Sequence, residues 1–161
     1  LAQQVGGSLG FTGVILGTFA VGGVLSAAFF ARRPVRRPDR AVIISTGLSG
    51  LALAAVGLAP TPLLLLVAAF AMGATEPPLI SAMFQVRVRE SPERVQGQVF
   101  TTSASLRMTA FALATALCGW LLHWGVAAVI AFGVGLHLLS LIIGLALGPD
   151  LPPREQWIRR R

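Results

Sequence analysis

The sequence predicts an all-α, polytopic membrane bundle of five transmembrane helices. Three observations support this fold class: 55% of the 161 residues are hydrophobic, only 12% are charged, and the charged residues cluster between long apolar runs. Soluble domains carry about twice that share of charged residues. The mean hydropathy of +0.77 is typical of a protein whose main partner is the lipid bilayer.

Five apolar segments each reach the length of about 20 residues that a helix needs to cross the hydrocarbon core. We expect the spans at residues 9–31, 41–59, 62–85, 99–122 and 124–147, followed by a cytoplasmic tail at 148–161. In the first span, Gly13 and Gly17 have the small-xxx-small spacing that lets helix backbones approach closely. Such pairs favour a packed polytopic bundle without identifying which helices touch.

The connectors between the spans alternate in charge. The first, RRPVRRPDR (32–40), holds five Arg, and the third, VRVRESPERVQG (86–97), holds three. The connectors near Pro60 and at 123–125 hold no formal charge, and the tail holds four Arg. The positive-inside rule then places both Arg-rich loops and the C-terminus in the cytoplasm. All 13 basic residues are Arg, which we interpret as the codon bias of a GC-rich genome, so we predict a multi-pass protein of a bacterial cytoplasmic membrane.

Composition and motifs argue against several other functions. The net charge of +7 comes from short loop clusters rather than from a basic face, which argues against a nucleic-acid partner. The sequence has no zinc-protease motif, no paired Cys/His spacing and no phosphate-binding loop. Cys118 is the one cysteine, and we interpret it as a packing residue. We therefore predict no enzyme activity, no metal and no cofactor.

Two charges interrupt the apolar spans. Glu76 lies in the third span and Arg107 in the fourth, and intramembrane charges mark functional sites by default. The loop between these antiparallel spans is centred near residue 91. Glu76 lies about fifteen residues before that centre and Arg107 about sixteen after it, so both are expected about 12–15 Å from the cytoplasmic end.

The pair has two interpretations. In the first, Glu76 and Arg107 form an interhelical salt bridge that fixes packing. In the second, they belong to a cavity that binds substrate or exchanges protons. Ser103 lies one turn before Arg107 and extends its polar stripe, which favours a bundle interior or a water-filled cavity over lipid.

Pro77 and Pro78 follow Glu76 directly and remove two backbone donors from the third span. We expect a helix break there, either a flexible one that bends during transport or a fixed kink. The carbonyls freed near Gly73 and Ala74 would need partners, which an Arg side chain or cavity water could supply.

The segment VRVRESPERVQGQVFTTSASLRMTAFALATALCGWLL (86–122) resembles the major facilitator superfamily. It is similar to the loop between the tenth and eleventh helices, and then the eleventh helix, of a bacterial drug-exporter-like member. Family members often have Arg-Gly before the Val-Phe pair, where this chain has Gln96 and Gly97.

The segment GGVLSAAFFARRPVRRPDRAVI (22–43) resembles the family's loop between the eighth and ninth helices. Its basic residues match the basic part of the family's gating motif, whereas the acidic and glycine positions do not match cleanly. We interpret the arginines first as topology determinants and second as a gating contact. They are Arg32, Arg33, Arg36, Arg37 and Arg40.

This resemblance maps the five spans onto helices eight to twelve of a twelve-helix transporter, so we expect a partial fold of that family and a missing N-terminal half as partner. It implies secondary active transport of a small molecule by alternating access, with proton-coupled efflux, as in an antiporter, as the expected mode. The alternative from another class is a non-transporting five-span remnant or scaffold subunit.

Overall fold

The computed structural model describes residues 9–33 and 37–147, and within these ranges it contains helices and no strand. The long helices are α1 (Leu9–Ala31), α2 (Pro38–Leu58), α3 (Pro62–Glu90), α4 (Gln96–Leu121) and α5 (Val126–Leu147). Two short 3₁₀ turns, η1 (Glu93–Val95) and η2 (Leu122–Trp124), flank α4. Five helices in the described part are long and apolar enough to span a membrane, which confirms the predicted fold class.

Local sequence explains where the helices begin and end. Pro38 and Pro62 occupy the first turns of α2 and α3. Backbone N–H groups in the first turn have no partner within the helix, so a proline there costs no hydrogen bond. The Thr61 side chain caps α3 by accepting a hydrogen bond from the Leu64 backbone N–H at 3.4 Å, and α3 ends just before Pro92. Gly125, at φ 98°, makes the left-handed turn before α5 because glycine adopts that conformation without strain.

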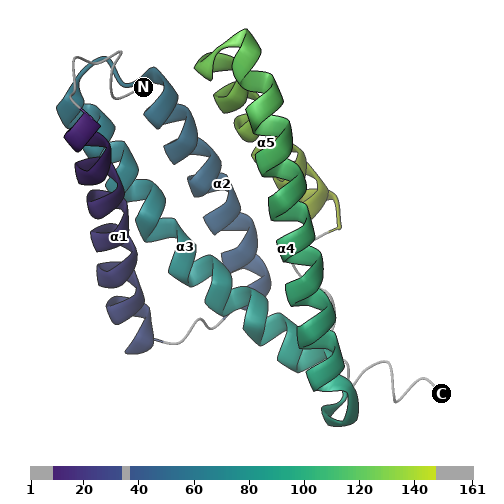
Figure 1. Cartoon of the computed structure of the whole chain (residues 1–161). Helices are drawn as coiled ribbons and strands as arrows, with labels where there is room; N and C mark the ends of the chain where they lie inside the picture. The colour runs from purple at the N-terminus through teal and green to yellow at the C-terminus, as the bar shows by residue number, and fades with distance from the viewer. Residues whose placement is uncertain (1–8, 34–36, 148–161) are drawn as a thin grey trace.

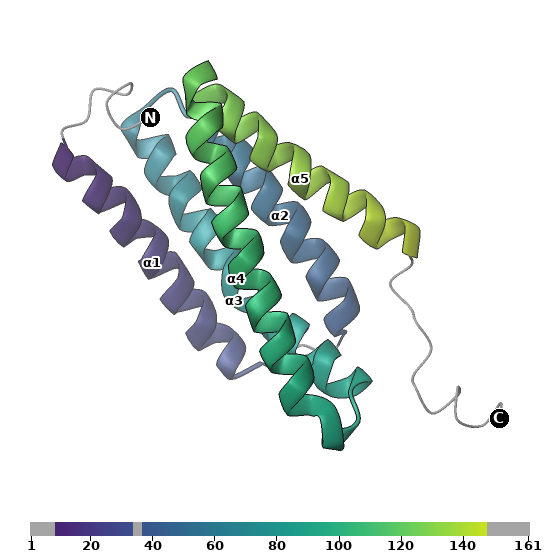
Figure 2. The same ribbon diagram turned by 45° about the vertical axis from the view of Figure 1, so that its right-hand side comes forward.

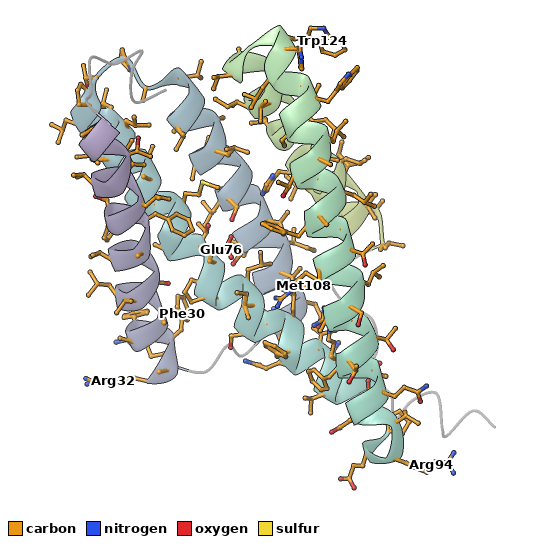
Figure 3. All side chains as sticks on the ribbon, in the orientation of Figure 1. Phe30, Arg32, Glu76, Arg94, Met108 and Trp124 are labelled. Atoms are coloured by element: carbon orange, nitrogen blue, oxygen red, sulfur yellow. The ribbon has the colours of Figure 1, made fainter. Side chains whose placement is uncertain are left out.

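The helices run alternately up and down, as the charge pattern predicts. In Figure 3, Arg32 and Arg94 lie at one end of the bundle and Trp124 lies at the other. The 3₁₀ turn beside Trp124 also brings this ring 4.6 Å, between centroids, from the ring of Trp120. Aromatic side chains of this kind are typical of membrane–water interfaces. Arg36 and the tail at 148–161 lie outside the described residues.

Helix α3 is the centre of the bundle. It packs against α1 on one side and α2 on the other, and α2 packs in turn against α5 (Figure 1). Helix α4 has sparse contacts with α3 and α5, and in Figure 2 it passes in front of α3. Most large apolar side chains are exposed, as expected for helices that meet lipid or further protein rather than water.

Glycines bring α1 and α3 into backbone contact. A Cβ placed on Gly73 would collide with the carbonyl of Phe19, and one placed on Gly22 would collide with the carbonyl of Phe70. The predicted small pair Gly13 and Gly17 has no described neighbour within 4 Å of a Cβ at either position. The close crossing of this bundle is therefore at Gly22 and Gly73, not at the first GxxxG of the sequence.

Helix α3 remains helical from Pro62 to Glu90, through Pro77 and Pro78. The flexible break or fixed kink expected at these prolines stays a prediction. The Ser26 hydroxyl on α1 donates a hydrogen bond of 2.7 Å to the Ala74 carbonyl, one of the two acceptors that the prolines leave without a helical donor. A hydroxyl from the neighbouring helix thus takes the place of the Arg side chain or water that the sequence predicts.

Replacing Ser26 with alanine is expected to destabilise the protein by about 1–2 kcal/mol, because the Ala74 carbonyl loses its donor in an apolar setting. Titration with sodium dodecyl sulfate in mixed micelles would measure the change. Thr18→Ala is the matched control, since the Thr18 hydroxyl bonds only the Val14 carbonyl of its own helix among the contacts described, at 2.8 Å. Equal unfolding midpoints for the two variants would contradict this role of Ser26.

Candidate functional site

Glu76 lies about halfway along α3 (Figure 3). Its side chain is half-buried, and within the described residues it forms neither a salt bridge nor a hydrogen bond. At 100° per residue, it lies about 60° around α3 from Gly73, which touches α1, and about 100° from Thr75, which touches α2. Glu76 therefore occupies a face of α3 between its two packed sides.

Helix α4 is anchored near its ends and is exposed between them. Near its start, the Phe100 ring stacks on Phe84 of α3 with centroids 5.6 Å apart. Near its end, Leu121 is buried at 8% exposure. Every residue of the intervening stretch 104–117 is exposed.

Arg107 belongs to the inward stripe of α4, although its side chain is exposed. It lies about 20° around the helix from Phe100 and about 40° from Leu121, the residues that meet the rest of the bundle. Ser103, one turn earlier on this stripe, is half-buried. Arg107 therefore lies on the side of α4 that faces the bundle, within the stretch 104–117 where α4 is not tightly packed.

Glu76 and Arg107 do not form a salt bridge in this structure of residues 9–33 and 37–147. In Figure 3, Glu76 and Met108, the residue after Arg107, lie at similar heights in the bundle, as the predicted depths require. The contact is absent because the middle of α4 stands away from α3. The structural salt bridge, one of the two interpretations drawn from sequence, is therefore not formed in this conformation.

A hydroxyl cluster joins α2 and α3 beside Glu76. Ser49, at 5% exposure, lies with its hydroxyl 2.6 Å from that of Thr75, and the Thr75 hydroxyl donates to the Met72 carbonyl at 2.7 Å. Sequence reasoning missed Ser26, Ser49 and Thr75. The available signal was their position inside apolar spans, where a hydroxyl needs a partner.

A second missed contact lies at the Arg-rich end. Arg89, in the last turn of α3, donates two hydrogen bonds of 2.8 Å to the two carboxylate oxygens of Asp39 in the first turn of α2. Its Nε also lies 2.8 Å from Glu90. The helix dipole favours an acid at the start of a helix and a cation at its end. The paired hydrogen bonds between Arg89 and Asp39 therefore hold the end of α3 to the start of α2.

The predicted loop arginines have separate surroundings. The Arg33 guanidinium lies 4.9 Å from the Phe29 ring centroid, and Arg32 points away from the end of α1 (Figure 3). Arg37 precedes α2 without a side-chain capping bond. In the described ranges, no three His, Cys, Asp or Glu side chains come together as a metal site would require.

The geometry is that of a helical membrane bundle with two charges in its middle. Comparison with protein families identifies the family to which the chain belongs. The family model described as Major Facilitator Superfamily matches residues 1–161. The chain belongs to the Major Facilitator Superfamily. Comparison with curated proteins and comparison with solved structures each gave no match.

Membership in the Major Facilitator Superfamily confirms the resemblance seen at residues 22–43 and 86–122 at the level of the family. It implies membrane transport of small molecules in a lipid environment, and members of this superfamily are generally not enzymes. The five helices of the described part fit a partial bundle of the superfamily. The transported molecule and the energy source belong to the proposal that follows.

Proposed function

We propose that this chain is the C-terminal part of a proton-coupled exporter of small, hydrophobic molecules, with its five helices corresponding to helices eight to twelve. The observation that carries the proposal is Glu76: a half-buried carboxylate in the middle of a membrane helix, without a described partner. Placing a charged carboxylate inside the membrane costs free energy, and such residues typically belong to a substrate or proton pathway.

In this mechanism Glu76 is the proton carrier. The charged form is disfavoured in an apolar interior and favoured by a nearby cation. When the cavity opens to the proton-rich side, Glu76 takes up a proton; when it opens to the other side, Glu76 releases the proton. Because the two states differ by one charge, protonation changes which conformation is stable.

In this proposal Arg107 and Ser103 would lie on the opposite wall of a cavity that Glu76 lines in the complete transporter. Their stripe on α4 faces the bundle, but the exposed stretch 104–117 leaves room for Arg107 to move. Arg107 would approach Glu76 when the carboxylate is charged and withdraw when it is protonated or when substrate binds. The separation of the two groups seen here would then be one state of the cycle.

The transport pathway requires the N-terminal half of the transporter, because alternating access rocks two helical halves about a central site. The exposed middle of α4 is available for that half. The positive-inside rule orients the chain with the Arg32 and Arg94 end in the cytoplasm of a bacterial cell. On this orientation, Asp39 and Arg89 join α2 and α3 at the cytoplasmic surface.

Inverted membrane vesicles from cells that express this chain together with the proposed N-terminal half would test the proposal. Respiration acidifies their interior, and a fluorescent weak base reports the pH gradient. Adding hydrophobic compounds one at a time is expected to release protons for those that are exported, and a protonophore should abolish the signal. If no compound releases protons beyond vesicles that lack the protein, proton-coupled export is excluded for that panel and the proposal fails.

A further inference from the structure

An apolar groove runs along the side of the bundle where α1 and α2 flank α3. One cavity of about 510 Å³ at the Arg-rich end is lined by residues of all three helices, among them Phe30, Ser45 and Pro78. A second, of about 660 Å³, continues between α2 and α3. The two adjoin because they share Leu48, Ala74 and Thr75 as lining residues.

This groove lies on a different face of α3 from Glu76. Its floor includes Ala71 and Pro78, which are about 140° and 160° around the helix from Glu76. Phe84, which contacts α4, also lies about 140° from Ala71. The groove therefore opens away from the candidate transport cavity and toward the surroundings of the bundle.

One end of the groove carries positive charge. Arg33 lines the 510 Å³ cavity, and Arg33 with Arg32 lines a neighbouring cavity of about 440 Å³. Within the described residues neither of these two guanidinium groups has a salt-bridge partner. Asp39, the acid on the first turn of α2, lines a cavity on another side of that helix and is engaged by Arg89.

The apolar part has the length of a lipid tail. From Ala41, at the Arg33 end, to Ala52 along α2 the helix rises about 16 Å, which is about half of the hydrocarbon thickness of a bilayer. An acyl chain of one leaflet could thus lie along Leu48 and Ala74 while its headgroup reaches the arginines. Basic pockets between membrane helices at the inner surface bind anionic lipid headgroups.

We propose that this groove is a binding site for an anionic phospholipid, with one acyl chain between α1 and α2 and the phosphate on Arg33 and Arg32. Charge complementarity selects the headgroup, because the groove end has two cations and no acid among its described lining residues. The site does not depend on the proposed proton coupling, since it lies on the opposite face of α3.

Native mass spectrometry of the detergent-purified protein would test the site. The probes are phosphatidylglycerol and phosphatidylcholine with the same acyl chains, and glycerol phosphate as the soluble headgroup. Phosphatidylglycerol is expected to stay bound in preference to phosphatidylcholine, and Arg33→Gln should weaken it about fivefold. Arg94→Gln removes the same charge from the exposed η1 turn, at a distance from the groove, and should leave binding unchanged.

A second variant tests the acyl channel. Leu48 is 50% exposed and lines both cavities, so Leu48→Trp fills the groove without burying new bulk in the core. It should reduce phosphatidylglycerol binding while Leu16→Trp, on an exposed site of α1, does not. Three outcomes would each overturn the proposal. Both phospholipids could bind equally, the Arg33 and Arg94 variants could have equal effects, or glycerol phosphate could bind as strongly as the lipid. Failure of every phospholipid to bind would indicate that further protein covers the groove, and would also overturn it.

Discussion

Vesicles that carry Glu76→Gln are expected to lose substrate-driven proton release entirely, to the level of vesicles without the protein. Glutamine keeps the size and the hydrogen-bonding capacity of the side chain but cannot exchange a proton. Among the acidic residues that the structure describes, Glu76 alone lies in the middle of a membrane helix. Downhill movement of the same substrate, without a pH gradient, is expected to persist, because the pathway itself is not altered.

The comparison of coupled and downhill movement separates proton coupling from folding. Glu93→Gln is the matched control: it makes the same chemical change on the exposed η1 turn and should leave both activities intact. If Glu76→Gln retains normal proton release and an unchanged pH profile, Glu76 is not the proton carrier. If both activities disappear together, the residue supports the structure instead, and the mechanism proposed for it is wrong.

Gly73→Val is expected to cause the largest loss of stability among single substitutions in the bundle. A Cβ at this position collides with the backbone carbonyl of Phe19, and a backbone atom cannot move aside as a side-chain end can. The two helices would have to separate, which also lengthens the hydrogen bond from Ser26 to the Ala74 carbonyl. Overpacking of this kind costs about 3 kcal/mol, at the upper end of the usual range.

Heating the detergent-purified protein and measuring the fraction that remains monodisperse by gel filtration would test this prediction. Gly17→Val introduces the same side chain on α1 at a position with no described neighbour within 4 Å of the new Cβ. It should behave as the parent protein does, whereas Gly22→Val should resemble Gly73→Val. Survival of Gly73→Val at the same temperatures as Gly17→Val would show that α1 and α3 do not cross as described.

Much of the fold could be predicted because the bilayer simplifies the problem. A backbone in lipid has to satisfy its own hydrogen bonds, so a long apolar run becomes a helix, and the first expected span, 9–31, coincides with α1. The other helices differ from the expected spans mainly at the loops. Helix α3, for example, continues to Glu90 because its last turn carries Arg87 and Arg89, cations that a helix C-terminus favours.

The candidate site could be predicted only in part. The similar depth of Glu76 and Arg107 follows from counting residues along antiparallel helices, and Figure 3 shows Glu76 and Met108, the residue after Arg107, at similar heights. Their contact could not be predicted, because it depends on how far the middle of α4 stands from α3. The Ser26 donor could not be predicted either, since 48 residues separate it from Ala74 and only the crossing of α1 over α3 brings them together.

The sequence by itself determined that the described part of this protein is a bundle of five apolar helices that can span a membrane, with arginines at one end and two charges in its middle. Those properties depend on hydropathy, length and charge order, which are local or additive along the chain. Only the tertiary structure decided that Gly22 and Gly73 form the crossing, that Glu76 lacks its expected partner, and that a groove ends at Arg33. Each of these depends on the rotation and separation of helices, and those are set by all the packed side chains together.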